Sequence, residues 1–170
     1  MNLSKQKNKR IGIFGLSITG ISVYKNLVNV AKDIVCYDDS KINKESFSIE
    51  FGDQNLFSIE DKKWTELDAI VISPGIPHSH RIFEIASSNG IAITSDVELF
   101  VEENPASEFI FITGTNGKST VTALTGHILK KVGLDYHIGG NIGTPVMSLP
   151  NNRKGYILEL SSFQIELLNK

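Results

Sequence analysis

The sequence predicts an α/β protein built from parallel strands, with helices on the faces of the sheet. Short apolar segments, of the length expected for buried strands, alternate with longer segments of helical periodicity. Most of the apolar segments end in glycine, proline or aspartate, which are residues that terminate strands. The alternation stops at a polar break and then starts again. Such alternation is typical of parallel sheets, and its restart indicates two α/β regions.

The first region contains four expected strands and two clear helices. The strands are Arg10–Phe14, Asp33–Tyr37, Ala69–Ile72 and Ile91–Thr94. The helices are Thr19–Val30 and Ser79–Asn89. Gly90 suits the position just past the second helix, and Ser95 and Asp96 suit the start of a further one. This order of elements is a Rossmann-like layout.

The second region begins after the polar segment Glu102–Pro105, so the domain boundary is expected between residues 103 and 104. Residues 1–103 would form a Rossmann-like domain, and residues 104–170 the start of a second α/β domain. Its expected strands are Phe109–Thr113 and Tyr156–Leu160, and its expected helix is Lys118–Val132. One face of that helix carries Val121, Leu124, Ile128 and Val132. The sheet would be partial, with an exposed strand edge that invites aggregation.

Composition excludes several classes of protein. The 170 residues carry a net charge of -2, which argues against a general nucleic-acid binder. No apolar run approaches the roughly 20 residues that span a bilayer, so no membrane partner is expected. The single cysteine, Cys36, rules out an intramolecular disulfide, and its apolar neighbours indicate a core residue rather than a nucleophile. Together these features predict a cytoplasmic protein.

The segment at residues 113–120 reads Thr-Gly-Thr-Asn-Gly-Lys-Ser-Thr, follows an expected strand and opens an expected helix. This is the context of a phosphate loop, because glycines let backbone N–H groups turn toward an anion at a helix N-terminus. Lys118 would reach the β- and γ-phosphates of ATP, and the hydroxyl of Ser119 or Thr120 would bind Mg²⁺. The two glycines lie closer together than the strict pattern requires, so an ordinary strand-to-helix turn is the alternative.

A second candidate for nucleotide binding is the loop after the first strand. Gly12, Gly15 and Gly20 lie in or beside this loop but do not spell G-x-G-x-x-G. Asp38 ends the second strand, near where an acidic residue meets the ribose or base of a nucleotide in a Rossmann-like unit. The loop is therefore expected to bind a phosphorylated nucleotide that need not be NAD. A purely structural turn is the alternative.

Three further features lie at strand ends. Ser73-Pro74-Gly75-Ile76-Pro77 follows the third strand, at the edge where open α/β sheets bind ligands. Gly139-Gly140-Asn141-Ile142-Gly143 is a second glycine cluster, whose amide side chain suits a diphosphate, although either segment has a plain loop as its alternative. Glu159 lies in an apolar strand, where a carboxylate is costly unless it is paired or bound to a metal. It is expected to hold Mg²⁺, with a water-facing glutamate at a strand edge as the alternative.

These motifs, in this order, resemble those of the Mur ligases. The 113–120 segment is shared widely in that family. The branch is indicated by five further segments, namely Gly15–Ser22, Ser73–Ile76, Asp96–Phe100, Gly140–Gly143 and Glu159–Gln164. Their set and order resemble the ligases that add D-glutamate. The resemblance covers nearly the whole chain from Arg10 onward.

The resemblance implies an ATP-dependent, amide-bond-forming ligase of peptidoglycan precursor synthesis. ATP would phosphorylate the terminal carboxylate of UDP-N-acetylmuramoyl-L-alanine, and the amine of D-glutamate would then displace phosphate. Lys118 and Glu159 would be catalytic, and Ser119 and Glu159 would hold Mg²⁺. The ATP-binding residues would be Gly114, Thr115, Asn116, Gly117, Lys118, Ser119 and Thr120. The UDP-substrate would contact Ile18, Thr19, Asp38, Ser73, Asn141 and Ser161.

The resemblance is incomplete in two respects. The family's threonine–arginine pair after the aspartate that matches Asp38 is Asp39-Ser40 here, so the uracil contacts on that side would differ. Family members have three domains, whereas this chain is expected to end within the central ATP-binding domain, without a C-terminal domain. We therefore expect a monomer that does not catalyse ligation alone, because domain closure normally completes such a site. A non-catalytic UDP-nucleotide-binding remnant and a nicotinamide oxidoreductase are the alternatives.

Overall fold

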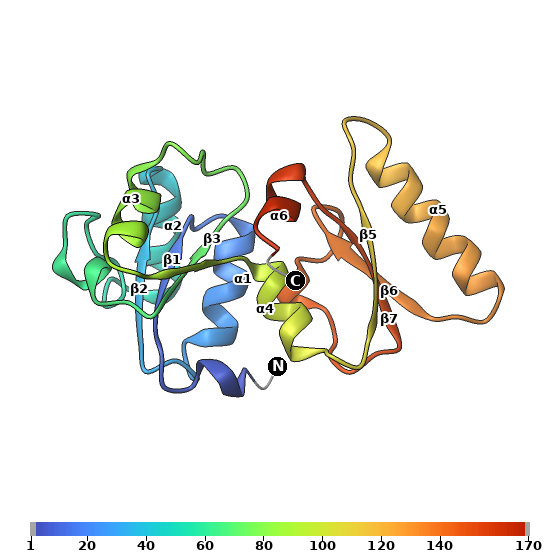
Figure 1. Ribbon diagram of the computed structural model, residues 1–170, viewed down its shortest axis with the longest axis horizontal. Coiled ribbons are helices and arrows are strands. Elements are labelled where there is room, and N and C mark those ends of the chain that lie inside the picture. The colour runs from blue at the N-terminus through green and yellow to red at the C-terminus, as the bar shows by residue number, and fades with distance from the viewer. Residues whose placement is uncertain (1–2, 169–170) are drawn as a thin grey trace. The chain divides into compact units, whose positions relative to one another are not determined.

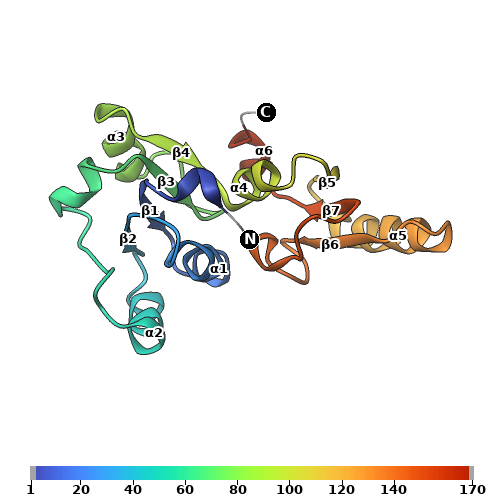
Figure 2. The ribbon, with the colours of Figure 1, turned by 90° about the horizontal axis from the view of Figure 1, so that it is seen from below.

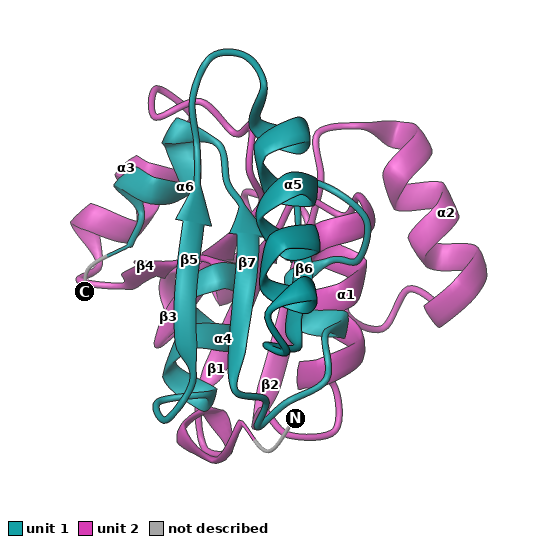
Figure 3. Cartoon of the chain, turned by 90° about the vertical axis from the view of Figure 1, so that its right-hand side faces the viewer, with its two compact units in different colours: residues 1, 97–170 teal, residues 2–96 magenta. Residues whose placement is uncertain are grey.

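The computed structural model describes residues 3–168, which form an α/β protein with parallel sheets (Figure 1). The chain divides into two compact units (Figure 3). The first unit ends at Asp96 and the second begins at Val97, so nearly all of helix α4 (Asp96–Glu103) belongs to the second. The domain limits 1–103 and 104–170 suggested by the sequence stay predictions.

The first unit is built around a four-stranded parallel sheet in the order β2-β1-β3-β4. Its strands are β1 (Arg10–Phe14), β2 (Asp33–Tyr37), β3 (Ala69–Ile72) and β4 (Ala92–Thr94). The first three begin and end where the sequence predicts. Phe14 pairs with Tyr37 on one side and with Ile72 on the other. The carboxyl ends of the three strands therefore meet at one edge, where their loops can act together.

Three helices flank this sheet, namely α1 (Ile18–Leu27), α2 (Lys41–Phe51) and α3 (Arg81–Ser88). Two 3₁₀ helices, η1 (Ser4–Gln6) and η2 (Lys62–Thr65), complete the unit. Figure 2 shows α1 and α3 on opposite sides of the sheet. The sequence did not predict α2, because Phe47 is its only fully buried residue and leaves little apolar periodicity. Phe47 packs edge-on against Tyr24 of α1, with ring centroids 4.8 Å apart.

The core of the first unit contains the only tryptophan and the only cysteine of the chain. Trp64 is fully buried and lies edge-on to Phe14, with ring centroids 6.0 Å apart. Gly12 makes room for it, because a Cβ there would come within 2.8 Å of the indole. Cys36 is also fully buried, and burial raises the pKa of its thiol. The prediction that Cys36 is a core residue is therefore confirmed.

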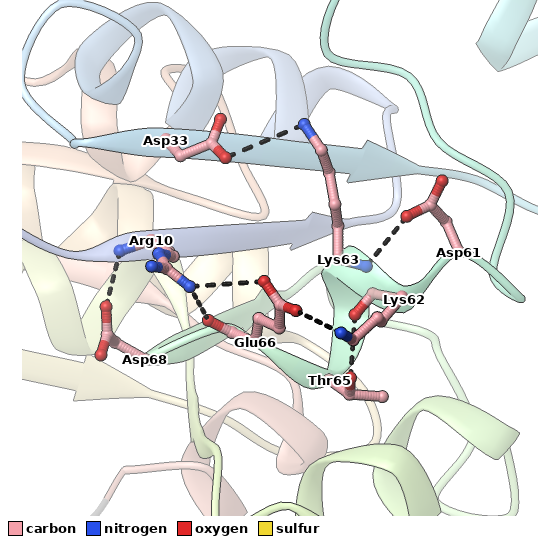
Figure 4. Close-up of polar contacts among 8 residues, drawn as sticks. All are labelled: Arg10, Asp33, Asp61, Lys62, Lys63, Thr65, Glu66 and Asp68. Atoms are coloured by element: carbon pink, nitrogen blue, oxygen red, sulfur yellow. Dashed lines mark hydrogen bonds and ion pairs between the residues drawn. The ribbon is translucent and has the colours of Figure 1, made fainter.

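A network of charged side chains ties together the amino ends of these strands (Figure 4). The backbone N–H of Arg10 donates to the carboxylate of Asp68 over 2.7 Å, and its guanidinium lies 3.5 Å from Glu66. Lys63 lies 3.9 Å from Asp33 at the start of β2. The ion-paired side chains are 42–45% exposed, so solvent screens each pair and it contributes little to stability. The charges in this network compensate one another, at the edge opposite the carboxyl ends.

The second unit contains a three-stranded parallel sheet in the order β5-β7-β6. Its strands are β5 (Glu108–Ile112), β6 (Tyr136–Gly140) and β7 (Gly155–Glu159). Besides α4, its helices are α5 (Lys118–Lys131), the short α6 (Ser162–Glu166) and the 3₁₀ helix η3 (Val146–Ser148). The sequence did not predict β6, because its glycines weaken the strand signal.

Helices cover both faces of the second sheet. Phe100 of α4 packs against Tyr156 of β7, with ring centroids 4.8 Å apart. On the other face, Gly126 of α5 lies so close to β6 that a Cβ would come within 2.4 Å of Ile138. Within residues 3–168, no helix of either unit is long and apolar enough to cross a bilayer.

Candidate functional site

The glycine turn after β1 is held by backbone hydrogen bonds at the carboxyl edge of the first sheet. Gly15 has a φ of 97°, a region that favours glycine. Its N–H donates to the carbonyl of Tyr37 at the end of β2, over 2.8 Å. The N–H of Ser73, just after β3, donates to the carbonyl of Phe14 over 2.9 Å. The loops that follow three neighbouring strands are thus connected to one another.

Asp38, predicted as a nucleotide contact, lies in the centre of these loops and is 8% exposed. Its carboxylate accepts hydrogen bonds from the N–H of Leu16 over 2.6 Å and the N–H of Ser40 over 2.7 Å. It also accepts from Nδ2 of Asn43 on α2, over 2.9 Å. Three of roughly four acceptor positions on the carboxylate are therefore used within the chain. Asp38 thus connects the glycine turn to the start of α2, and one acceptor position of its carboxylate has no hydrogen bond within residues 3–168.

Ser73 and Gly20 complete the packing around the turn. The Ser73 hydroxyl donates to the carbonyl of Gly15 over 2.9 Å, in a buried position. Gly20 lies on the first turn of α1, where an added Cβ would stand 1.8 Å from the same carbonyl oxygen. No side chain other than hydrogen fits there. The glycine at position 20 lets α1 begin directly against the turn.

The N-terminus of α1 carries the two other predicted contacts of the first unit, Ile18 and Thr19. Its N-cap residue, Ser17, makes no side-chain capping bond. The backbone N–H groups at the start of a helix have no acceptor within the helix and carry a partial positive charge. The side chain of Ile18 is 75% exposed. This end of α1 therefore presents amide donors suited to a phosphate or diphosphate.

His80, to which no role was assigned from the sequence, connects two loops of the same edge. Its Nδ1 accepts from the N–H of Ile82 over 3.1 Å and so caps α3. Its Nε2 lies 3.2 Å from the carboxylate of Asp39, and its ring lies 4.7 Å from that of Phe14. A histidine before a helix start is a weak sequence signal. Only the pairing of β1 between β2 and β3 brings His80 and Asp39 together.

An open cavity of about 330 Å³ lies beside the carboxyl end of β2. It is lined by Tyr37, Lys44, Leu56, Phe57 and Ser58. The Lys44 ammonium lies 4.5 Å from the centre of the Tyr37 ring, which is a cation–π contact. No motif pointed to this cavity, because its walls come from α2 and from a segment bridged to β2 at Cys36 and Leu56.

In the second unit, the 113–120 loop joins β5 to α5. Gly114 and Gly117 have φ values of 147° and 75°, and Gly117 is the N-cap of α5. The ammonium of Lys118 donates to the carbonyl of Gly114 over 2.8 Å, so the lysine folds back over its own loop. The loop residues from Gly114 to Gly117 are exposed. The arrangement leaves the first N–H groups of a helix of 14 residues open to an anion.

Glu159 is the last residue of β7 and pairs with Ile112, the last residue of β5, directly before the 113–120 loop. The residue is only 5% exposed, which excludes the alternative of a water-facing glutamate. Among residues 3–168, its Oε2 has no hydrogen-bond partner. A buried carboxylate oxygen without a donor is costly and suits a cation. Ser119, the other predicted Mg²⁺ ligand, lies in the first turn of α5. Within residues 3–168, no group of three or more His, Cys, Asp or Glu side chains that could hold a metal occurs.

Asn141 follows the carboxyl end of β6 and Ser161 follows that of β7, and both hydrogen-bond to Gln164 near Glu159. The N–H of Asn141 donates to the carbonyl of Glu159 over 2.9 Å, and its Nδ2 donates to Oε1 of Gln164 over 2.8 Å. Ser161 and Gln164 form a capping box at the start of α6. Gln164, which the sequence did not assign as a site residue, therefore orients the Asn141 amide.

The sequence comparisons identify the family. Residues 9–95, just over half of the chain, match the sequence model of the Mur ligase MurD-like N-terminal domain. The chain belongs to the Mur ligase family. The chain is 48% identical over 166 residues to a Rickettsia prowazekii protein named UDP-N-acetylmuramoylalanine–D-glutamate ligase. It is 41% identical over 174 residues to a protein of the same name from the Wolbachia of Brugia malayi.

These Mur ligase relatives are much longer than the chain. The alignments cover 98% and 99% of this chain but only 37% and 35% of the relatives. The fold agrees with a solved structure of the family, a Neisseria UDP-N-acetylmuramate:L-alanyl-gamma-D-glutamyl-meso-diaminopimelate ligase. That comparison has a TM-score of 0.52 at 17% identity, over 92% of this chain and 55% of the other. It supports the arrangement of strands and helices.

Proposed function

We propose that this chain is the nucleotide-binding part of a ligase that adds D-glutamate to UDP-N-acetylmuramoyl-L-alanine with ATP and Mg²⁺. The reaction belongs to peptidoglycan precursor synthesis. The observation that carries the proposal is the 48% identity, over 98% of the chain, to a protein named for this reaction. In this proposal the first unit binds the UDP-substrate and the second unit binds ATP.

The carboxyl edge of the first sheet suits a uridine diphosphate. The open amides of Ile18 and Thr19, at the start of α1, would receive the diphosphate. Asp38 keeps one acceptor position, and the Ser73 hydroxyl oxygen can also accept, so both suit hydroxyl or N–H donors of the nucleoside. The hydrogen bonds between the loops would hold these groups in place before the ligand arrives, which reduces the entropy lost on binding.

The second unit suits ATP and Mg²⁺. The backbone of residues 114–120 would surround the phosphates, with Lys118 turning from the carbonyl of Gly114 toward them. The unpartnered Oε2 of Glu159 and the hydroxyl of Ser119 would hold Mg²⁺, together with phosphate oxygens and water. When bound, Mg²⁺ neutralises charge on the transferring phosphoryl group. Asn141 and Ser161 would contact the diphosphate and the sugar–peptide end of the substrate.

The proposed reaction has two steps. The γ-phosphoryl group of ATP moves to an oxygen of the alanyl carboxylate, and ADP leaves. The amine of D-glutamate then attacks the acyl carbon, the bond to phosphate breaks, and the amine loses a proton. Lys118 would stabilise the charge that develops in the first step. Because the relatives are nearly three times as long, we expect the 170-residue chain alone to bind both nucleotides without forming the amide.

Calorimetric titration with ATP and Mg²⁺ tests this assignment. The Glu159→Gln variant should lower the Mg²⁺-dependent affinity for ATP by at least about tenfold, a loss common even for residues that only support a metal ligand. Glu84→Gln, an exposed change on α3, should leave the affinity unchanged. Equal affinities for the chain and the Glu159→Gln variant would contradict the proposed role of Glu159.

Titration with UDP-N-acetylmuramoyl-L-alanine tests the first unit separately. Binding of this substrate without any binding of ATP would favour the alternative of a non-catalytic UDP-nucleotide-binding remnant. D-glutamate-dependent phosphate release by the 170-residue chain would show that it ligates alone, contrary to our expectation.

A further inference from the structure

The dipeptide Asn-Gly occurs twice in the chain, as Asn89-Gly90 and as Asn116-Gly117. The carboxamide of asparagine is one of the chemically labile groups of proteins. A following glycine promotes its loss, because glycine has no side chain that would keep its nitrogen away from the carboxamide carbon. Both dipeptides are exposed, so water reaches them equally. A difference in reactivity between them must therefore come from the fold.

Hydrogen bonds restrain the first of these dipeptides. Asn89 is the C-cap of α3, and its Nδ2 donates to the carbonyl of Ile85 over 2.8 Å. The N–H of Gly90 donates to the carbonyl of Ser87 over 3.4 Å. Both groups that would react with each other are thus bonded to α3. A reaction between them has to break these contacts, which slows it.

The second dipeptide is not restrained in this way. It lies in the 113–120 loop, which Figure 3 shows projecting beyond the end of the sheet between β5 and α5. Within residues 3–168, neither the Asn116 carboxamide nor the Gly117 N–H has a hydrogen-bond partner. The space beside Gly117 is open, since no atom lies within 4 Å of an added Cβ. The carboxamide can therefore approach the Gly117 nitrogen without breaking a contact.

The two dipeptides also lie at opposite ends of a helix. Gly117 is the N-cap of α5, whereas Asn89 is the C-cap of α3. Attack on the carboxamide begins when the glycine nitrogen loses its proton and becomes an anion. The positive end of the α5 dipole and the adjacent ammonium of Lys118 stabilise that anion, while the negative end of the α3 dipole opposes it. Electrostatics and hydrogen bonding therefore favour reaction at the same dipeptide.

We propose that Asn116 is a site of spontaneous deamidation, in which the backbone of Gly117 is the nucleophile. The Gly117 nitrogen, after losing its proton to hydroxide, forms a bond to Cγ of Asn116. The bond from Cγ to Nδ2 breaks, and ammonia leaves with a proton taken from water. Water then opens the cyclic imide, at Cγ to give aspartate or at the backbone carbonyl to give isoaspartate. The net change consumes one water and turns the amide into a carboxylate and ammonium.

The consequence of this reaction rests on the proposed function of the loop, although the reaction itself does not. Both products place a negative charge between Gly114 and Lys118, where the phosphates of ATP would bind. Isoaspartate also lengthens the backbone of the loop by one carbon, which displaces its N–H groups. Deamidation therefore removes ATP binding from the chain. Bound ATP with Mg²⁺ occupies the loop and slows the reaction, so the empty loop is the form that loses activity with time.

Peptide mass spectrometry of the 170-residue chain, incubated without nucleotide at neutral pH, measures each dipeptide separately. Asn116 should convert to aspartate and isoaspartate at least about tenfold faster than Asn89, given the hydrogen bonds and the helix end that protect Asn89. In concentrated urea, which removes the fold, the two residues should convert at nearly equal rates. Folded-state conversion of Asn116 no faster than that of Asn89 overturns the proposal, as does a difference that persists unchanged in urea.

The Asn116→Asp variant, which reproduces one product, tests the consequence. Its affinity for ATP with Mg²⁺, measured by calorimetry, should be at least about tenfold lower than that of the fresh chain, because a negative charge faces the phosphates. The matched control is Asn89→Asp, which adds the same charge at the end of α3 and should leave the affinity unchanged.

Added ATP with Mg²⁺ should also slow the conversion of Asn116 and not that of Asn89. A fresh chain that binds ATP no better than the Asn116→Asp variant does, or a conversion rate that bound ATP leaves unchanged, overturns the inferred consequence. A fresh chain that binds no ATP at all contradicts the proposed function instead. The conversion rates of the two asparagines then still decide whether Asn116 is the site of deamidation.

Discussion

The two candidate phosphate-binding turns of this chain differ in how they are held. In the first unit, the turn at Gly15 is fixed by hydrogen bonds from its own N–H, from Ser73 and to Asp38. In the second unit, the ammonium of Lys118 donates to the carbonyl of Gly114 across the 113–120 loop. Both turns join a parallel strand to a helix N-terminus. The first is therefore shaped by the fold, whereas the second is exposed and depends on fewer contacts.

This difference indicates two modes of binding. A turn fixed by its neighbours loses little entropy when a ligand arrives, and its residues serve the fold and the ligand at the same time. An open loop beside a buried carboxylate with an unpartnered oxygen is completed by the ligand and cation. Substitutions in the first turn should consequently affect stability most, and substitutions in the second should affect binding most.

The largest stability effect is expected for Gly20→Ala. The new Cβ would stand 1.8 Å from the carbonyl oxygen of Gly15, and neither backbone can yield without moving α1. The free energy of unfolding of the first unit should fall by about 3 kcal/mol or more. Urea unfolding followed by the fluorescence of Trp64, the only tryptophan, measures this unit directly.

The control for that change is Gly90→Ala. Gly90 has a positive φ, at 66°, but no atom lies within 4 Å of an added Cβ, so it tests backbone strain without a close approach. Only the backbone strain of about 1 kcal/mol should appear. Equal losses at positions 20 and 90 would show that the close approach of α1 to the turn does not determine stability.

The sequence predicted the strands of the first unit closely because their signals are local. β1, β2 and β3 are short, apolar and ended by residues that break strands, so their limits need no tertiary information. Helix α2 and strand β6 were not predicted because their local signals are weak. Helix α2 buries only Phe47, and strand β6 ends in two glycines, so the formation of both depends on the rest of the fold.

A smaller effect is expected for Asp38→Asn. The amide keeps the shape of the carboxylate but removes its charge and turns one acceptor into a donor. One of the N–H groups of Leu16 and Ser40 would then face a donor in a buried site. The first unit should lose about 2 kcal/mol, the size expected for a buried charge-assisted hydrogen bond. Trp64 fluorescence again reports unfolding, and an unchanged midpoint in urea would show that Asp38 does not hold the turn.

Candidate site residues can be proposed from sequence where one residue type implies one chemistry. Lys118 and Glu159 were proposed in this way, and their roles stay predictions, although the burial of Glu159 beside the end of β5 agrees with that reasoning. The roles of partners could not be predicted, because they arise from contacts between distant segments. His80 with Asp39 and Gln164 with Asn141 are such pairs. The three internal hydrogen bonds to the Asp38 carboxylate likewise became visible only in the fold.

The smallest stability effect is expected for Gly117→Ala in the second unit. Gly117 has a φ of 75°, yet no atom lies within 4 Å of an added Cβ. The change should therefore cost only the strain of about 1 kcal/mol of a left-handed alanine. Amide exchange of the β7 strand gives the local free energy, since the second unit contains no tryptophan. A loss as large as that of Gly20→Ala would mean that the 113–120 loop is already locked by the fold, and the contrast between the two turns would no longer hold. A loss near 1 kcal/mol together with weakened ATP binding would instead identify position 117 as a residue that serves the ligand more than the fold.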